Sequence, residues 1–84
     1  MAVTVRYFAS LREALGSAET VDLPAMGCTL AQLRDALIAR GGRHAEVLNR
    51  SRPLRCALDQ VLAGDGTVVA EGAEVAFFPP VTGG

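Results

Sequence analysis

The sequence predicts an α+β domain in which a mixed sheet of four or five strands packs on one main helix. Several short segments alternate apolar and polar side chains, which is the two-residue period of a half-buried strand. One longer segment, from Leu30 to Ile38, repeats its apolar positions at helical spacing. Because 84 residues can enclose only one modest hydrophobic core, we expect a single domain.

The beginning of the chain is predicted to form a strand, a short helix and a second strand. Residues 3–8 alternate in side-chain type and should be half buried. Ser10 and Glu13 have the spacing of a capping box, which favours a short helix over residues 11–15. Residues 20–23 then form the second strand. So little chain between the two strands indicates that they pair antiparallel.

The main helix is predicted to begin after a second capping box, formed by Thr29 and Gln32. Its apolar stripe must cover the sheet, because an amphipathic helix buries that face against another element. The glycines at 41–42 are expected to end it. Residues 45–48 permit a further short helical turn.

The last part of the chain predicts short strands joined by turns. Residues 54–58 alternate, and residues 59–60 should turn the chain back through residues 61–62. A brief edge element is expected at residues 68–69 and the last strand at residues 74–78. With the first and last strands adjacent in the middle of the sheet, this order is the β-grasp, or ubiquitin-like, arrangement.

The composition excludes several classes of function. The net charge of −1 and the pI near 5.7 argue against a nucleic-acid surface, which would be strongly basic. We expect no membrane segment and no signal peptide, and we therefore expect the chain to be cytoplasmic. All 8 basic residues are arginines. The base composition of the source genome would explain this. Whatever the cause, the chain has no lysine amine that its own activated carboxylate could acylate.

The cysteines and the histidine suggest no metal site. Cys28 and Cys56 have no Cys-x-x-Cys spacing, and His44 is distant from both in the sequence. We expect reduced structural thiols and a solvated histidine at a loop or helix start, and we assign none of the three a role. The Gly64 to Gly66 loop lacks the lysine and the length of a phosphate-binding loop.

The end of the chain carries the strongest functional signal. Two prolines remove backbone donors, so the last strand must leave the sheet there. We therefore divide the chain into a domain over residues 1–78 and an extended tail over residues 79–84. The tail residues are Pro79, Pro80, Val81, Thr82, Gly83 and Gly84. Extended, they would reach roughly 20 Å, enough for the Gly84 carboxylate to enter another protein's active site. A frayed terminus is the alternative.

Residues 71–84 resemble the C-terminus of the small, sulfur-carrying subunit of molybdopterin synthase, through Phe-Phe-Pro-Pro-Val-Thr-Gly-Gly. Residues 7–13 resemble the first strand and helix of that family. Two departures are the missing lysines and Asp59, where relatives often carry Asn.

The resemblance implies a cosubstrate that carries no catalytic residues itself and binds no cofactor. It implies that a ubiquitin-activating-like adenylyltransferase uses ATP to adenylate the Gly84 carboxylate, and that a sulfur donor protein converts it to a thiocarboxylate. Within a heterotetramer, the large synthase subunit would then pass the sulfur to cyclic pyranopterin monophosphate. Two alternatives stay open: a sulfur carrier for thiamine thiazole or another thio-product, and a ubiquitin-like protein modifier or plain interaction module.

A docking surface is predicted from strand parity. Phe8 on the first strand and Phe78 on the last should share the sheet face opposite the helix. Leu62 on the return strand is expected to extend the same apolar patch. Exposed aromatic side chains are common anchors at interfaces, so these three residues are predicted to contact both the activating enzyme and the large subunit. Alternatively, the two phenylalanines are covered by loops as ordinary core.

Overall fold

The computed structural model describes residues 1–24 and 27–80. Its helices and strands are, in chain order, β1 (Ala2–Tyr7), α1 (Ser10–Leu15), β2 (Ala18–Asp22), β3 (Cys28–Thr29), α2 (Leu30–Ile38), α3 (Gly42–Leu48), β4 (Arg55–Leu58), β5 (Val61–Ala63), β6 (Val68–Val69) and β7 (Glu74–Phe78). Within these residues, none of the helices is long and apolar enough to span a bilayer.

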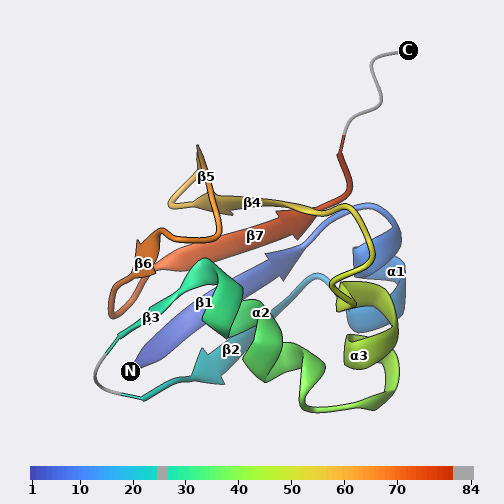
Figure 1. Ribbon diagram of the computed structural model, residues 1–84, viewed down its shortest axis with the longest axis horizontal. Helices are drawn as coiled ribbons and strands as arrows, with labels where there is room; N and C mark the ends of the chain where they lie inside the picture. Colours follow the sequence, from blue (N-terminus) through green and yellow to red (C-terminus); the bar gives the residue numbers. More distant parts are fainter. Residues whose placement is uncertain (25–26, 81–84) are drawn as a thin grey trace.

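The main sheet has the strand order β2-β1-β7-β4-β5, and the helices lie together on one of its faces (Figure 1). β1 and β7 are parallel neighbours in the middle, and the other pairs are antiparallel. β3 and β6 form a separate two-stranded sheet. The predicted β-grasp fold is therefore confirmed, including the central pairing of the first and last strands.

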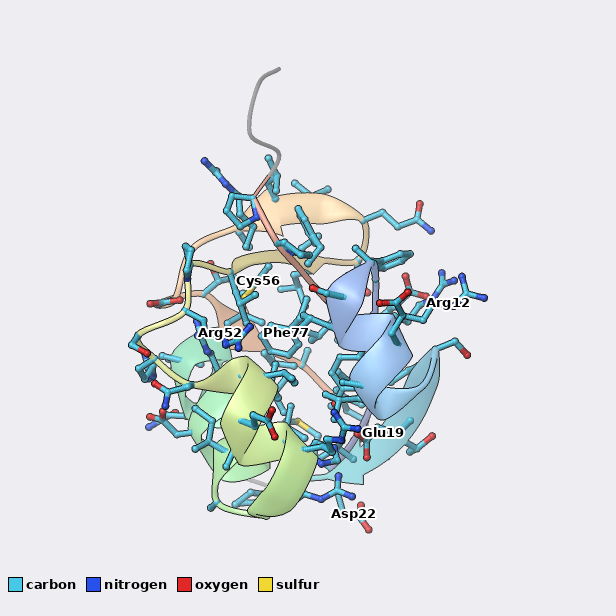
Figure 2. All side chains as sticks on the ribbon, turned by 90° about the vertical axis from the view of Figure 1, so that its right-hand side faces the viewer. Arg12, Glu19, Asp22, Arg52, Cys56 and Phe77 are labelled. Carbon is cyan, nitrogen blue, oxygen red and sulfur yellow. The ribbon has the colours of Figure 1, made fainter. Side chains whose placement is uncertain are left out.

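The core lies between the inner face of the sheet and the apolar stripe of α2. Val5, Val75 and Phe77 in the central strands are fully buried, as the alternation predicts. Leu33 and Leu37 of α2 are equally buried against them. Burying one such side chain stabilises the fold by about 1.5–3 kcal/mol, so this contact holds the helix on the sheet. Figure 2 shows Phe77 between the sheet and the helices.

One predicted capping box is confirmed and the other is wrong. Thr29 Oγ1 accepts from Gln32 N at 3.2 Å, and Gln32 Oε1 accepts from Thr29 N at 2.9 Å. At α1, Ser10 is already helical, and the N-cap is Ala9, which makes no side-chain bond. The chain turns so sharply after β1 that the helix begins one residue earlier than the Ser10 to Glu13 spacing suggests.

Several boundaries differ from the prediction. β1 ends at Tyr7, so Phe8 lies just after the strand, and β2 spans Ala18–Asp22 where residues 20–23 were predicted. α2 ends at Ile38, and Gly41 caps the start of α3 with a φ of 76°, so the glycines at 41–42 begin the next helix. α3 is also longer than the predicted turn at residues 45–48. The strand at Cys28 was not predicted, because two residues are too short for a period and their partner, β6, is distant in the sequence.

Candidate functional site

The tail begins at the end of the central strand β7. Phe78, the last residue of β7, lies opposite Arg55 of β4. Pro79 and Pro80 follow outside the strand and are half buried. Because proline has no backbone N–H, the sheet ladder ends at this point. The predicted tail residues Val81, Thr82, Gly83 and Gly84 lie outside the described residues. Figure 1 shows β7 between β1 and β4, running towards the end from which the prolines leave.

The outer face of the sheet, opposite the helices, carries a row of side chains across four strands. Ala76 of β7 lies opposite Arg6 on one side and Ala57 on the other, and Ala57 lies opposite Leu62. Paired residues in neighbouring strands project from the same face. Arg6 and Ala76 therefore share this face, as the strand alternation predicts, and Leu62 lies on the same face and is 63% exposed.

A groove of about 470 Å³ is hollowed in this outer face. We call it the outer groove, and it is lined by Arg6, Phe8, Ala57, Gln60, Glu74, Ala76 and Phe78. Phe8 is 38% exposed and Phe78 is half buried, so the alternative that loops cover both aromatic side chains is wrong. The fold thus brings Phe8 and Phe78 together in one concave, mainly apolar surface.

The charges in the outer groove are arranged around Phe8. The Arg6 guanidinium lies over the Phe8 ring, 5.3 Å from its centroid, which is within cation–π range. Arg6 Nη1 also lies 3.8 Å from Glu74 Oε2. Both charged groups are partly exposed, so the ion pair contributes little stability. Strand alternation places Arg6 and Glu74 on this face, because they have the same parity as Phe8 and Phe78, whereas nothing local indicated Gln60.

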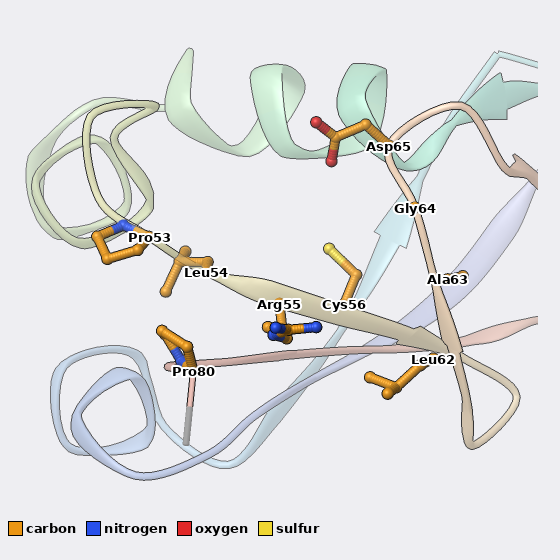
Figure 3. Close-up of a pocket in the computed structure, with 9 residues that line it drawn as sticks. All are labelled: Pro53, Leu54, Arg55, Cys56, Leu62, Ala63, Gly64, Asp65 and Pro80. Carbon is orange, nitrogen blue, oxygen red and sulfur yellow. The ribbon is translucent and has the colours of Figure 1, made fainter. Parts of the chain in front are cut away.

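Leu62 lines a different hollow, of about 660 Å³, beside the root of the tail (Figure 3). Its other lining residues are Pro53, Leu54, Arg55, Cys56, Ala63, Gly64, Asp65 and Pro80. Leu62 therefore lies outside the outer groove, although it is on the same face of the sheet. It extends the outer face laterally, because β5 lies beyond β4 at the sheet edge.

The two thiols fit the expected structural role. Burial raises the pKa of Cys56 to about 11, with a smaller contribution from Asp65. Burial also raises the pKa of Cys28. The thiolate is the nucleophilic form, so both side chains are poor nucleophiles at neutral pH. Within residues 1–24 and 27–80, no group of three or more His, Cys, Asp or Glu side chains could hold a metal ion.

His44 is not the solvated residue that the sequence suggested. It lies in α3, and its side chain is only 18% exposed. Its Nε2 lies 2.8 Å from Glu19 Oε2, and its ring meets Tyr7 edge to face. Tyr7 Oη donates to the same Glu19 oxygen at 2.7 Å, and Arg40 Nη1 donates to the other. This Glu19 cluster ties β1 and β2 to the region of α2 and α3.

Comparison with known proteins shows what the chain is similar to. The molybdopterin synthase sulfur carrier subunit of Escherichia coli (strain K12) is 38% identical over 82 residues, which cover 98% of this chain and 99% of that protein. Among solved structures, small archaeal modifier protein 1 of Haloferax volcanii is 27% identical with a TM-score of 0.75, covering 95% of this chain and 98% of that chain.

A third comparison concerns an assembly. The protein–protein complex of subunit 1 and 2 of molybdopterin-converting factor from Helicobacter pylori 26695 contains a chain that is 26% identical, with a TM-score of 0.68 and 100% of both chains covered. Finally, the model of the ThiS family matches residues 5–84, a range that includes the tail. These matches confirm the resemblance drawn from the tail motif, and the chain belongs to the ThiS family.

Proposed function

We propose that this chain is the sulfur carrier of molybdopterin synthase and that the Gly84 carboxylate is the group that carries the sulfur. The observation that carries the proposal is the match to the Escherichia coli sulfur carrier subunit over 99% of that protein. The family match through residue 84 supports a role for the Gly-Gly tail itself. The raised thiol pKa values support the same assignment, because they disfavour sulfur transfer on Cys28 or Cys56.

The chemistry requires activation by another protein. A carboxylate is a poor electrophile, so one Gly84 oxygen attacks the α-phosphate of ATP, pyrophosphate leaves, and an acyl adenylate forms. A hydrosulfide ion supplied by a sulfur donor protein then attacks the acyl carbon, the bond to AMP breaks, and a thiocarboxylate remains. The adenylyltransferase, the sulfur donor and ATP are part of the proposal, as is cyclic pyranopterin monophosphate as the final acceptor. The glycines leave the carbonyl carbon unhindered, because they have no Cβ.

Docking is proposed on the outer groove, with the large synthase subunit as the partner. The complex of subunit 1 and 2 from Helicobacter pylori supports a partner of this kind. Phe8 and Phe78 would supply the apolar anchors, and Leu62 would extend the contact over the sheet edge. The prolines begin directly after Phe78, so a partner held at the groove is close to the start of the tail.

The tail mechanism is tested by adding one residue after Gly84. The extended chain should fold normally but give neither thiocarboxylate nor molybdopterin, because the activated carboxylate is displaced from its position. Intact-mass measurement after incubation with the activating enzyme, ATP and sulfur donor reads the replacement of one oxygen by sulfur. Thiocarboxylate on the extended chain would refute the mechanism.

The docking surface is tested with Phe78→Ala. Truncating a well-packed interfacial aromatic typically costs about 2 kcal/mol of binding, roughly a thirtyfold loss of affinity. The affinity for the purified large subunit is measured by titration calorimetry, and thermal unfolding is measured beside it. A folded variant with wild-type affinity would remove Phe78 from the interface.

A protein modifier is the second candidate, favoured by the similarity to small archaeal modifier protein 1 of Haloferax volcanii. In that case the Gly84 carboxylate would form isopeptide bonds with lysine amines of other proteins. Expression of the tagged chain distinguishes the two functions. A ladder of conjugates that disappears when Gly84 is deleted supports the modifier, whereas a thiocarboxylate without conjugates supports the carrier. A carrier for thiamine thiazole or another thio-product would be identified by testing which purified acceptor protein receives sulfur from the thiocarboxylate.

A further inference from the structure

Strained backbone is concentrated beside the outer groove. In the described part of the chain, the residues other than glycine with a positive φ are Ala9 (54°), Asp59 (49°) and Gln60 (71°). Ala9 follows Phe8 at one end of the groove, and Gln60 lines the groove itself. Residues with a Cβ rarely adopt such angles, because the Cβ approaches the backbone carbonyl. Strain that persists next to a binding groove points to a use for the side chain that is held there.

At Gln60, no hydrogen bond of the side chain within the described residues offsets the cost of the positive φ. Gln60 is the second residue of the two-residue hairpin between β4 and β5, where glycine is usual because both residues need a positive φ. Asp59 has a local role, because its N–H donates to Glu74 O at 2.8 Å and its Oδ1 accepts from Glu74 N at 3.0 Å. Within the described residues the Gln60 side chain makes no comparable hydrogen bond. A glycine would form the same turn without the strain.

The chemistry of the groove shows what the Gln60 amide could recognise. The walls are apolar at Phe8, Ala57, Ala76 and Phe78, and the two charged side chains, Arg6 and Glu74, face each other. Gln60 is the neutral polar side chain in this lining, and an amide offers both a donor and an acceptor. A protein segment that fills an apolar groove removes its own peptide groups from water, and each of these needs a hydrogen-bond partner.

We propose that Gln60 is a specificity residue of the outer groove, whose side-chain amide hydrogen-bonds a main-chain peptide group of the docked large subunit. The inference rests on the proposed function, since docking of that subunit is itself proposed. The aromatic walls supply apolar contact, and the amide fixes the position of the bound segment along the groove. A glycine would relieve the strain in this turn, but it could not make this bond.

The test uses two substitutions that remove the amide in different ways. Gln60→Met keeps the size and the strained backbone, whereas Gln60→Gly relieves the strain. Both should raise the Kd for the purified large subunit about tenfold in titration calorimetry, because the partner's peptide group is left unpaired. The melting temperature should stay unchanged in Gln60→Met and rise by about 4 °C in Gln60→Gly.

Ala9→Gly is the matched control, because it relieves a strained φ without removing a groove side chain. It should raise the melting temperature and leave the Kd unchanged. Wild-type affinity in Gln60→Met would overturn the inference, and Phe78→Ala then separates it from the proposed function. If Phe78→Ala still loses affinity, only the role of Gln60 is wrong; if neither variant changes the Kd, docking on the outer groove is wrong as well.

Discussion

Replacing Glu19 by glutamine should destabilise the fold in a way that depends on pH. The Glu19 carboxylate accepts hydrogen bonds from Tyr7, His44 and Arg40, three residues from different parts of the chain. An ionised carboxylate only accepts, so all three donors are matched, whereas a glutamine would present its NH₂ group to one of them. The substitution therefore removes the charge and also sets two donors against each other.

The size of the effect follows from the burial of each donor. Arg40 is half exposed, so its ion pair contributes at most a few tenths of a kcal/mol. Tyr7 is buried and His44 is mostly buried, and hydrogen bonds from such groups to a charged partner contribute about 1.5–3 kcal/mol. We expect Glu19→Gln to cost about 2 kcal/mol at pH 7, which lowers the melting temperature of a domain of this size by about 10 °C.

The pH dependence gives a second, independent signature. Burial alone would raise the pKa of Glu19, but the hydrogen bonds from His44, Arg40 and Tyr7 outweigh it and lower the pKa to about 2 from its ordinary value of 4.5. A carboxyl group with a depressed folded-state pKa stabilises the fold above its unfolded-state pKa and loses that contribution as the pH falls. The difference in free energy of unfolding between wild type and Glu19→Gln should therefore become smaller as the pH falls from about 4.5 to about 2.

Thermal unfolding followed by circular dichroism from pH 7 to pH 2.5 measures both effects. Asp22→Asn is the matched control, because Asp22 is an exposed carboxylate on the same strand, at the surface in Figure 2. The free energy of unfolding of that variant should stay within about 0.5 kcal/mol of the wild-type value at each pH. The reasoning is refuted if Glu19→Gln and wild type have the same melting temperature at pH 7. It is also refuted if the difference between their melting temperatures does not change with pH.

Two further predictions concern Arg34 and the two cysteines. Arg34 is 6% exposed and donates to the carbonyls of Leu48 (2.7 Å), Asn49 and Arg52 (3.0 Å), so Arg34→Met should cost about 3 kcal/mol by urea unfolding. The exposed Arg43→Met on α3 is its control, and equal midpoints for the two variants would contradict the assignment. Cys28→Ser and Cys56→Ser should each keep sulfur-carrier activity in the reconstituted transfer assay, and a folded Cys56→Ser chain that cannot transfer sulfur would place sulfur on a thiol instead.

The sequence determined those features that depend on neighbours along the chain. Alternation in residues 3–8 and 74–78 reports which side chains are buried, because a strand projects successive side chains to opposite faces. The Thr29 capping box is local as well, since both of its hydrogen bonds close within three residues. The double proline ends the last strand by removing backbone donors, whatever the fold around it.

The pairing of the first and last strands was predicted, but only the tertiary structure decided which side chains of these local elements meet. The outer groove joins Phe8 to Gln60 and Phe78, and these residues come together because β7 pairs with both β1 and β4. Leu62 lies on the same sheet face, next to Ala57 of the groove lining, but its side chain lines the other hollow at the sheet edge. His44 follows two glycines in the sequence and looked solvated, yet its partner is Glu19 in a distant strand. Contacts of this kind depend on strand order and helix placement, which are set by how the whole core packs, and no short stretch of sequence records them.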